Sequence, residues 1–185
     1  VVSRLGKAGV DSSRMSVDDR GVRRNPVFQG STALINMRPM RTHHWSGVGG
    51  CLKNYIMFTE SPPRYHADCC ASLGSIWLRP ELKAKTRLNV LVMLTPLFGG
   101  SGPHHFEPKF TWPYSGILFS TDPVAIDSVG LKILENRRSE YFGEPKPLSP
   151  PAKHIELAET RYGVGVADLR RIKIVKRGWQ DQSLV

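Results

Sequence analysis

The stretch that decides the fold runs from Ser31 to Phe58 and reads STALINMRPMRTHHWSGVGGCLKNYIMF. Its apolar start predicts a buried strand over 32–37, and a basic, histidine-bearing turn is expected to follow over 38–45. The glycine-rich segment 46–50 predicts the start of a helix that ends near Phe58. Ligands of α/β proteins bind where a strand ends and the next helix begins. The stretch therefore predicts a ligand site there.

Strands and helices alternate through the rest of the chain. Glycine- and proline-rich loops are expected over 95–114 and 145–151. The hydrophobic pattern predicts strands over 15–18, 88–94, 116–120 and 172–175, and helices over 1–9, 67–78, 121–141 and 154–162. This alternation predicts an α/β fold with a mostly parallel sheet flanked by helices. We expect a single domain over 1–178, followed by a polar tail over 179–185.

The composition excludes several classes of protein. The chain has 185 residues, 40% hydrophobic and 23% charged, which is typical of a globular domain, and its apolar runs fall short of the about 20 residues of a membrane helix. The three cysteines form no CxxC pair, so we expect no disulfide framework, zinc ribbon or iron–sulfur motif. Because the chain begins at Val1 inside a predicted helix, we expect that an N-terminal segment is missing. The protein would be exported to the periplasm if that segment is a signal peptide, and cytoplasmic otherwise.

The net charge of +10 leaves three alternatives for partners. These are a nucleic acid or phosphate, an anionic small molecule or acidic protein, and a merely soluble basic surface. Basic residues are scattered as pairs and no nucleic-acid motif accompanies them, so nucleic acid is the least favoured alternative.

Polar clusters follow four of the predicted strands. They comprise 18–20, 41–44, Thr95 with its loop, and 121–122. On a mostly parallel sheet all four clusters would lie at one edge. The convergence predicts a binding site at that edge, possible ligands being a divalent metal or an anion.

The candidate residues each have a functional and a structural interpretation. His43 and His44 would point to opposite sides of an extended chain, so one of them is expected to face a ligand as a metal ligand or acid–base group; otherwise they cap the helix. The glycines of 47–50 with Lys53 indicate an anion cradle or, equally, close packing of the helix on the sheet.

Four further candidates lie outside that cradle. Asn54 either orients a ligand or satisfies a loop carbonyl, and His66 is either a remote metal ligand or a helix cap. Asp122 is expected to cap a helix first and to bind a ligand second. Asp127 lies among apolar neighbours on the same predicted helix, so it needs a backbone amide, a basic side chain or a metal as its partner.

Two longer motifs resemble the bacterial and archaeal family called domain of unknown function 362. These are RPMRTHHWSGVGGCLKN, over 38–54, and SGILFSTDPVAIDSVGLKIL, over 115–134, while 5–19 and 163–175 are similar to the family's early and closing segments. The family's opening elements would precede Val1. The resemblance implies ligand-binding roles for Thr42, His43, Lys53, Asn54, Asp122 and Asp127, and metal binding for His43 and His66.

What the resemblance implies about activity is limited, because the family has no established reaction. Some members carry iron–sulfur ferredoxin modules and others a twin-arginine export signal, and this sequence contains neither. Many members have an acidic residue after the strand that corresponds to 88–94, where this chain reads VMLTPLFGGSG. If that acid is a ligand or base in relatives, its loss here alters the activity.

We therefore expect a protein that binds a metal ion or an anionic ligand at the strand ends, with a link to redox metabolism. Whether it is an enzyme stays open. The first alternative is a non-catalytic binding or assembly subunit of a larger complex, for which the missing acid and the basic surface are the motivation. The second is nucleic-acid binding through the basic surface.

Overall fold

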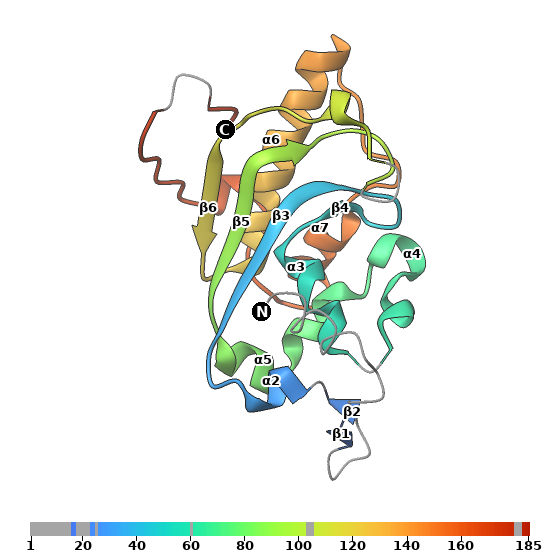
Figure 1. Cartoon of the computed structure of the whole chain (residues 1–185), viewed down its shortest axis with the longest axis vertical. Coiled ribbons are helices and arrows are strands. Elements are labelled where there is room, and N and C mark those ends of the chain that lie inside the picture. The colour runs from blue at the N-terminus through green and yellow to red at the C-terminus, as the bar shows by residue number, and fades with distance from the viewer. Residues whose placement is uncertain (1–15, 18–22, 25, 60, 103–105, 180–182) are drawn as a thin grey trace.

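The computed structural model describes residues 16–17, 23–24, 26–59, 61–102, 106–179 and 183–185. Its centre is a four-stranded sheet with the strand order β4-β3-β5-β6 (Figure 1). The strands are β3 (Leu34–His43), β4 (Gly47–Gly49), β5 (Thr86–Leu97) and β6 (Gly116–Ser120). A separate two-stranded sheet pairs β1 (Ser16–Val17) with β2 (Arg23–Arg24). The α/β class is confirmed.

The sheet is mixed, so the expectation of a mostly parallel sheet is wrong. β3 and β5 are parallel, but β4 is antiparallel to β3 and β6 is antiparallel to β5. A parallel neighbour needs a crossover, usually through a helix. Among its described residues, the long segment after β5 contains one short helix, η6 (Pro108–Phe110), and it folds back on itself through a bridge between Leu97 and Thr111. The chain therefore re-enters the sheet as β6, antiparallel to β5.

The strand predicted over 32–37 continues to His43, so most of the predicted basic turn is strand. Pairing of β3 with β5 and then with β4 extends it through these residues. The predicted helix after the glycines is one turn of α helix, α3 (Cys51–Asn54), followed by the 3-10 helix η2 (Tyr55–Phe58).

The connection from η2 to β5 is built from short helices. They are η3 (Pro62–Tyr65), α4 (Ala67–Cys70), η4 (Leu73–Leu78) and α5 (Pro80–Lys85). The single helix predicted over 67–78 is interrupted because Asp68, Cys69 and Cys70 have positive φ values of 50°, 54° and 63°. Such left-handed backbone cannot continue a right-handed helix.

Helix α6 (Pro123–Phe142) follows the prediction closely. The Asp122 carboxylate accepts hydrogen bonds from the Val124 and Ala125 amides, and Pro123 occupies the first turn. Gly143 ends the helix at φ 73°, a conformation that glycine adopts without strain. Two further helices are α2 (Pro26–Gly30) and α7 (Lys153–Thr160).

The C-terminal part differs from its prediction. The strand expected over 172–175 forms no ladder among the described residues and follows the short helix η7 (Leu169–Arg171) as extended chain. The helix expected over 1–9 and the polar cluster 18–20 lie outside the described residues.

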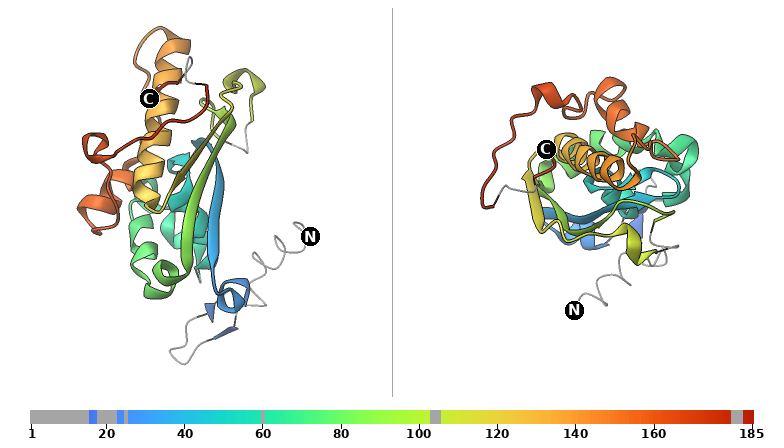
Figure 2. Two further views of the ribbon diagram at one scale, coloured as in Figure 1. Left: turned by 90° about the vertical axis from the view of Figure 1, so that its left-hand side faces the viewer. Right: turned by 90° about the horizontal axis from the view of Figure 1, so that it is seen from above.

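Helices α3, α6 and α7 all cover the same face of the sheet (Figure 2). The core lies between that face and the helices and includes Met40, Leu52, Leu91, Met93 and Ile133. On the opposite face, apolar side chains of β3, β5 and β6 stay exposed. They are Ile35, Met37, Leu94, Ile117 and Phe119. No helix of the described chain is long and apolar enough to span a membrane.

Candidate functional site

The amino end of α3 is held by a carboxylate from α6. Asp127 is fully buried, and its two oxygens accept hydrogen bonds from the Cys51 amide at 2.7 Å and the Leu52 amide at 2.8 Å. A Cβ at Gly50 would lie 2.4 Å from one of these oxygens, so only glycine fits there. The two amides that directly follow the glycines of the predicted anion cradle are therefore satisfied from within the protein.

Three asparagines connect α3 to the sheet. The Asn36 side-chain amide donates to the Cys51 carbonyl at 3.0 Å and to the Asn89 side-chain oxygen at 2.7 Å. The Asn54 amide donates to the Asn36 side-chain oxygen at 2.8 Å and to the Met37 carbonyl at 3.3 Å. These bonds satisfy buried polar groups and fix the position of α3 against β3.

Two arginines of β3 lie beside this network. Arg38 donates to the Asn54 side-chain oxygen at 2.8 Å, and its guanidinium and that of Arg41 come within 3.8 Å of the position a Cβ would take on Gly49. The Nε atoms of both arginines are buried and have no hydrogen-bond partner in the described structure. Burial, and then the neighbouring charge of Arg41, lower the pKa of Arg38 to about 10, while Asp127 opposes the change.

Lys53 is the most buried cation of the site. Lys53 is 3% exposed. Among the described residues its ammonium donates one hydrogen bond, to the Cys70 sulfur at 3.3 Å. Burial lowers the pKa of Lys53 from its ordinary value, and the Cys70 thiol opposes this change. A buried ammonium without a carboxylate partner is costly, so Lys53 marks this place as unusual.

Four aromatic rings lie together near Lys53, whose charge acts on two of them, His43 and His66. The rings of His43 and His44 are parallel to within 11° at 4.7 Å, and Trp45 lies 4.3 Å from His44 and 4.2 Å from His66. The two histidines therefore lie side by side rather than on opposite sides of the chain, because β3 ends at His43 and the turn begins. Trp45 is 48% exposed, so the stack reaches the surface.

The histidines are held neutral by burial and by the cations around them. Burial, followed by the charges of Lys53, His44, Arg41 and Arg38, lowers the pKa of His43 to about 3. Burial and Lys53 lower the pKa of His66 to about 4. Both rings are thus uncharged at neutral pH, when each nitrogen can act only as a neutral donor or acceptor.

A second buried histidine comes from α7. His154 is fully buried, and neither of its ring nitrogens has a hydrogen-bond partner in the described structure. Burial and then Lys53 lower its pKa to about 3. Its neighbour Lys153 forms an ion pair with Asp68, which connects α7 to the left-handed turn that carries Cys70.

The remaining predicted site residues have structural contacts. The Thr42 hydroxyl is buried and donates to the Gly99 carbonyl at 2.8 Å. Asp122 caps α6 and also accepts from the Val166 amide at 2.9 Å. Because β6 is antiparallel to β5, Asp122 lies beyond the opposite end of the sheet from His43. The predicted convergence at one edge thus joins His43, Lys53, Asn54 and Asp127 but not Asp122.

The predicted metal ligands His43 and His66 lie on either side of the ring stack. Within the described chain, no group of three or more histidine, cysteine or acidic side chains is arranged to hold a metal ion. Metal binding at His43 and His66 stays a prediction.

Several residues of the site escaped sequence reasoning. They are Asn36, Cys70, Asn89 and His154, whereas Arg38 and Arg41 were expected only as part of the basic turn 38–45. The one usable signal was polar residues, Asn36 and Asn89, inside otherwise apolar strands. No pattern in the sequence connects Cys70 or His154 to Lys53, because they come from distant segments.

Together, the fold and the site define a mixed α/β protein with a buried cationic cluster where β3, β4 and α3 meet. The profile of the family Domain of unknown function (DUF362) matches residues 21–132, which is more than half of the chain. The protein belongs to this family. Neither the curated proteins nor the solved structures contain a significant match to the chain.

Proposed function

We propose that the protein binds an anionic ligand at the cationic cluster, defined as Arg38, Arg41 and Lys53. The observation that carries the proposal is that these three cationic side chains are buried or half-buried together without enough negative charge to balance them. Asp127 is the carboxylate among the charges that shift the pKa of Arg38, and both of its oxygens are already bonded to the amides of α3. An anion would supply the missing countercharge.

The geometry of the cluster favours an oxyanion. A Cβ on Gly49 would lie 3.7 Å from Arg41 Nε and 3.8 Å from Arg38 Nη2, so both guanidinium groups border the space beside this glycine. Paired guanidiniums recognise carboxylate and phosphate oxygens through parallel N–H bonds. Neutral His43 would supply a further donor beside the cations. The same excess of positive charge repels a free metal ion, which is why we favour the anion over the metal.

Titration with inorganic phosphate, followed by calorimetry and by NMR of the histidine rings, tests the proposal. Arg41→Met and Lys53→Met each remove one cation and should raise the dissociation constant by about 10-fold or more, as expected for a lost charge-assisted hydrogen bond. The control is Arg170→Met, which removes the same charge from a side chain that is 90% exposed. Equal affinity of the three variants would refute the proposal.

The uncovered face of the sheet supports a second candidate function, an assembly subunit. Ile35, Met37 and Phe119 are 65%, 58% and 64% exposed on β3 and β6. Parallel strands such as β3 and β5 are normally covered on both faces. Sedimentation of the purified protein alone tests self-association, and a monodisperse monomer with unchanged solubility in Phe119→Ser would argue against this candidate.

A further inference from the structure

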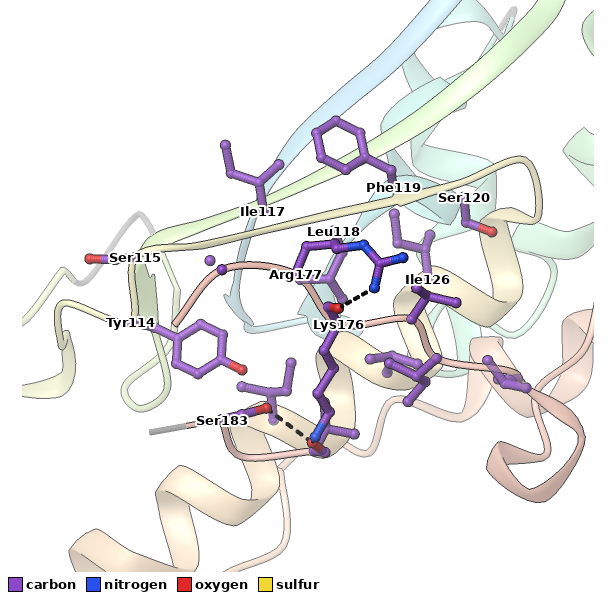
Figure 3. A pocket seen from close by; sticks show the side chains of 18 of the residues that line it. Tyr114, Ser115, Ile117, Leu118, Phe119, Ser120, Ile126, Lys176, Arg177 and Ser183 are labelled. Atoms are coloured by element: carbon purple, nitrogen blue, oxygen red, sulfur yellow. Dashed lines mark hydrogen bonds between the residues drawn. The ribbon is translucent and has the colours of Figure 1, made fainter. Parts of the chain in front are cut away.

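The outer edge of the sheet, on the side of β6, borders a cavity that is separate from the cationic cluster. The cavity has a volume of about 920 Å³ and lies between β6, helix α6 and the C-terminal extended segment. Its walls are Gly116–Ser120 of β6, apolar side chains of α6 such as Ile126 and Val129, and the residues 172–179. Figure 3 shows Lys176 and Arg177 opposite Leu118, with Ser120 and Ile126 toward one end and Tyr114 and Ser115 toward the other.

Both long walls of this cavity are extended backbone without a strand partner on the cavity side. β6 is the last strand of the sheet and pairs only with β5 among the described residues. The facing segment, Ile172–Val175, has the composition of a strand but forms no ladder in the described structure. An edge strand with free N–H and C=O groups is a template for pairing with another chain.

Several apolar side chains on the extended segments around the cavity are exposed. Ile174, Val175 and Trp179 are 40%, 61% and 101% exposed on one wall. Ile117 and Phe119 of β6 are also exposed, but they point to the opposite face of the sheet, away from Lys176 and Arg177 (Figure 3). Exposed β-branched and aromatic side chains on an extended segment lose their contact with water when a strand is added beside them.

The charge of the C-terminal wall indicates what the added strand would carry. Lys173, Lys176 and Arg177 are all exposed there, and none of the described residues that line the cavity is acidic. The Lys176 ammonium donates to a main-chain oxygen of Val185, and Arg177 donates to the Lys176 carbonyl. Among the described residues, neither cation is paired with an aspartate or a glutamate. A strand with acidic residues between apolar ones complements this wall.

We propose that this cavity is a slot for one β-strand of a partner polypeptide that alternates apolar and acidic residues. The strand adds to the free edge of β6 and lies against the segment 172–177. Its apolar side chains pack on α6, and its carboxylates pair with Lys176 and Arg177. The slot is independent of the anion site, which lies at the opposite edge of the same sheet.

The test uses a synthetic peptide of alternating valine and glutamate with blocked ends, added to the full chain. Amide hydrogen exchange should slow over 116–120 and over 172–177 when the peptide binds. Three further peptides act as controls: one with proline in place of every second valine, which cannot pair continuously, one with lysine for glutamate, and one with the same composition in a non-alternating order.

A charge-reversed variant makes the test specific. In Lys176→Glu/Arg177→Glu both side chains are exposed, so we expect the fold to be unchanged. This variant should bind the lysine peptide. Its dissociation constant for the glutamate peptide should rise by about 10-fold or more, because the ion pairs with Lys176 and Arg177 are lost; tenfold corresponds to about 1.4 kcal/mol.

Three outcomes would overturn the proposal. They are equal binding of the proline peptide, protection confined to the outer face of the sheet, and exchange over 116–120 that is already slow without peptide. The last would mean that a second copy of the chain, or another segment of it, occupies the edge. Loss of peptide binding in the charge-reversed variant with unchanged phosphate binding would distinguish this slot from the proposed anion site.

Discussion

The two edges of the sheet differ in how much of the protein contacts them. At the β4 side, α3 is tied to β3 by side chains, and even the Met37 carbonyl of β3 is bonded to Asn54. At the β6 side, the described residues leave the edge strand open beside a cavity. Buried polar groups make the first edge sensitive to single substitutions, whereas the second edge has few contacts to lose.

The largest effect should come from Asp127. In Asp127→Asn the side chain keeps one acceptor oxygen but no charge, so one α3 amide loses its bond and Arg38 loses a countercharge. We expect a loss of about 2–3 kcal/mol in the free energy of unfolding, measured by urea denaturation. A loss below about 0.5 kcal/mol, which is typical of surface substitutions, would show that the β4 side is less tightly built than its contacts indicate.

His154 should give the β4 side a distinct pH dependence. Its pKa is about 3 in the folded protein against about 6.5 when exposed, so the unfolded chain binds more protons between these values. The contribution of His154 to stability is therefore complete above about pH 6.5 and is lost as the pH falls toward 3. His154→Leu should reduce the slope of unfolding free energy against pH in this window by about one proton. Equal slopes in both proteins would mean that His154 is not buried neutral.

Substitution of Lys53 should weaken phosphate binding without lowering the stability of the fold. Lys53→Met removes a buried ammonium that has no carboxylate partner in the described structure, and methionine fills a similar space. We expect unchanged or increased stability, by up to about 1–2 kcal/mol, together with weaker phosphate binding. Thermal unfolding with and without phosphate measures both. A strong destabilisation would instead assign Lys53 a structural role through Cys70.

The smallest effect should come from the open edge. Phe119→Thr replaces a side chain that is 64% exposed with another strand-forming residue. We expect the free energy of unfolding to change by less than about 0.5 kcal/mol, while aggregation on concentration, followed by light scattering, decreases. A large loss of stability would show that this face is covered in solution and would end the contrast between the two edges.

Sequence reasoning succeeded where local chemistry decides the structure. Asp122 followed by Pro123 predicted the start of α6, and the apolar run 88–94 predicted the core of β5. It also predicted that His43, Lys53, Asn54 and Asp127 lie near one another, and their role as a binding site stays a prediction. Asp127 was expected to find a backbone amide, a basic side chain or a metal, and two amides hold it.

The errors arose where a long-range choice decides. Nothing in the segment 95–114 tells whether it crosses over the sheet or folds back, and the bridge between Leu97 and Thr111 makes it fold back. That reversal moved Asp122 away from His43. Likewise, residues 172–175 have the side chains of a strand, but a strand requires a neighbour to pair with, and the described structure supplies none.

The sequence by itself determined the α/β class, the family, the helix starts and the stretch that carries the site, because these depend on side chains near one another in the chain. Only the tertiary structure decided the strand directions, the meeting of Lys53 with Cys70 and the opening beside β6. These depend on which distant segments pair and pack. Such pairings are settled by the burial of whole faces rather than by any local pattern.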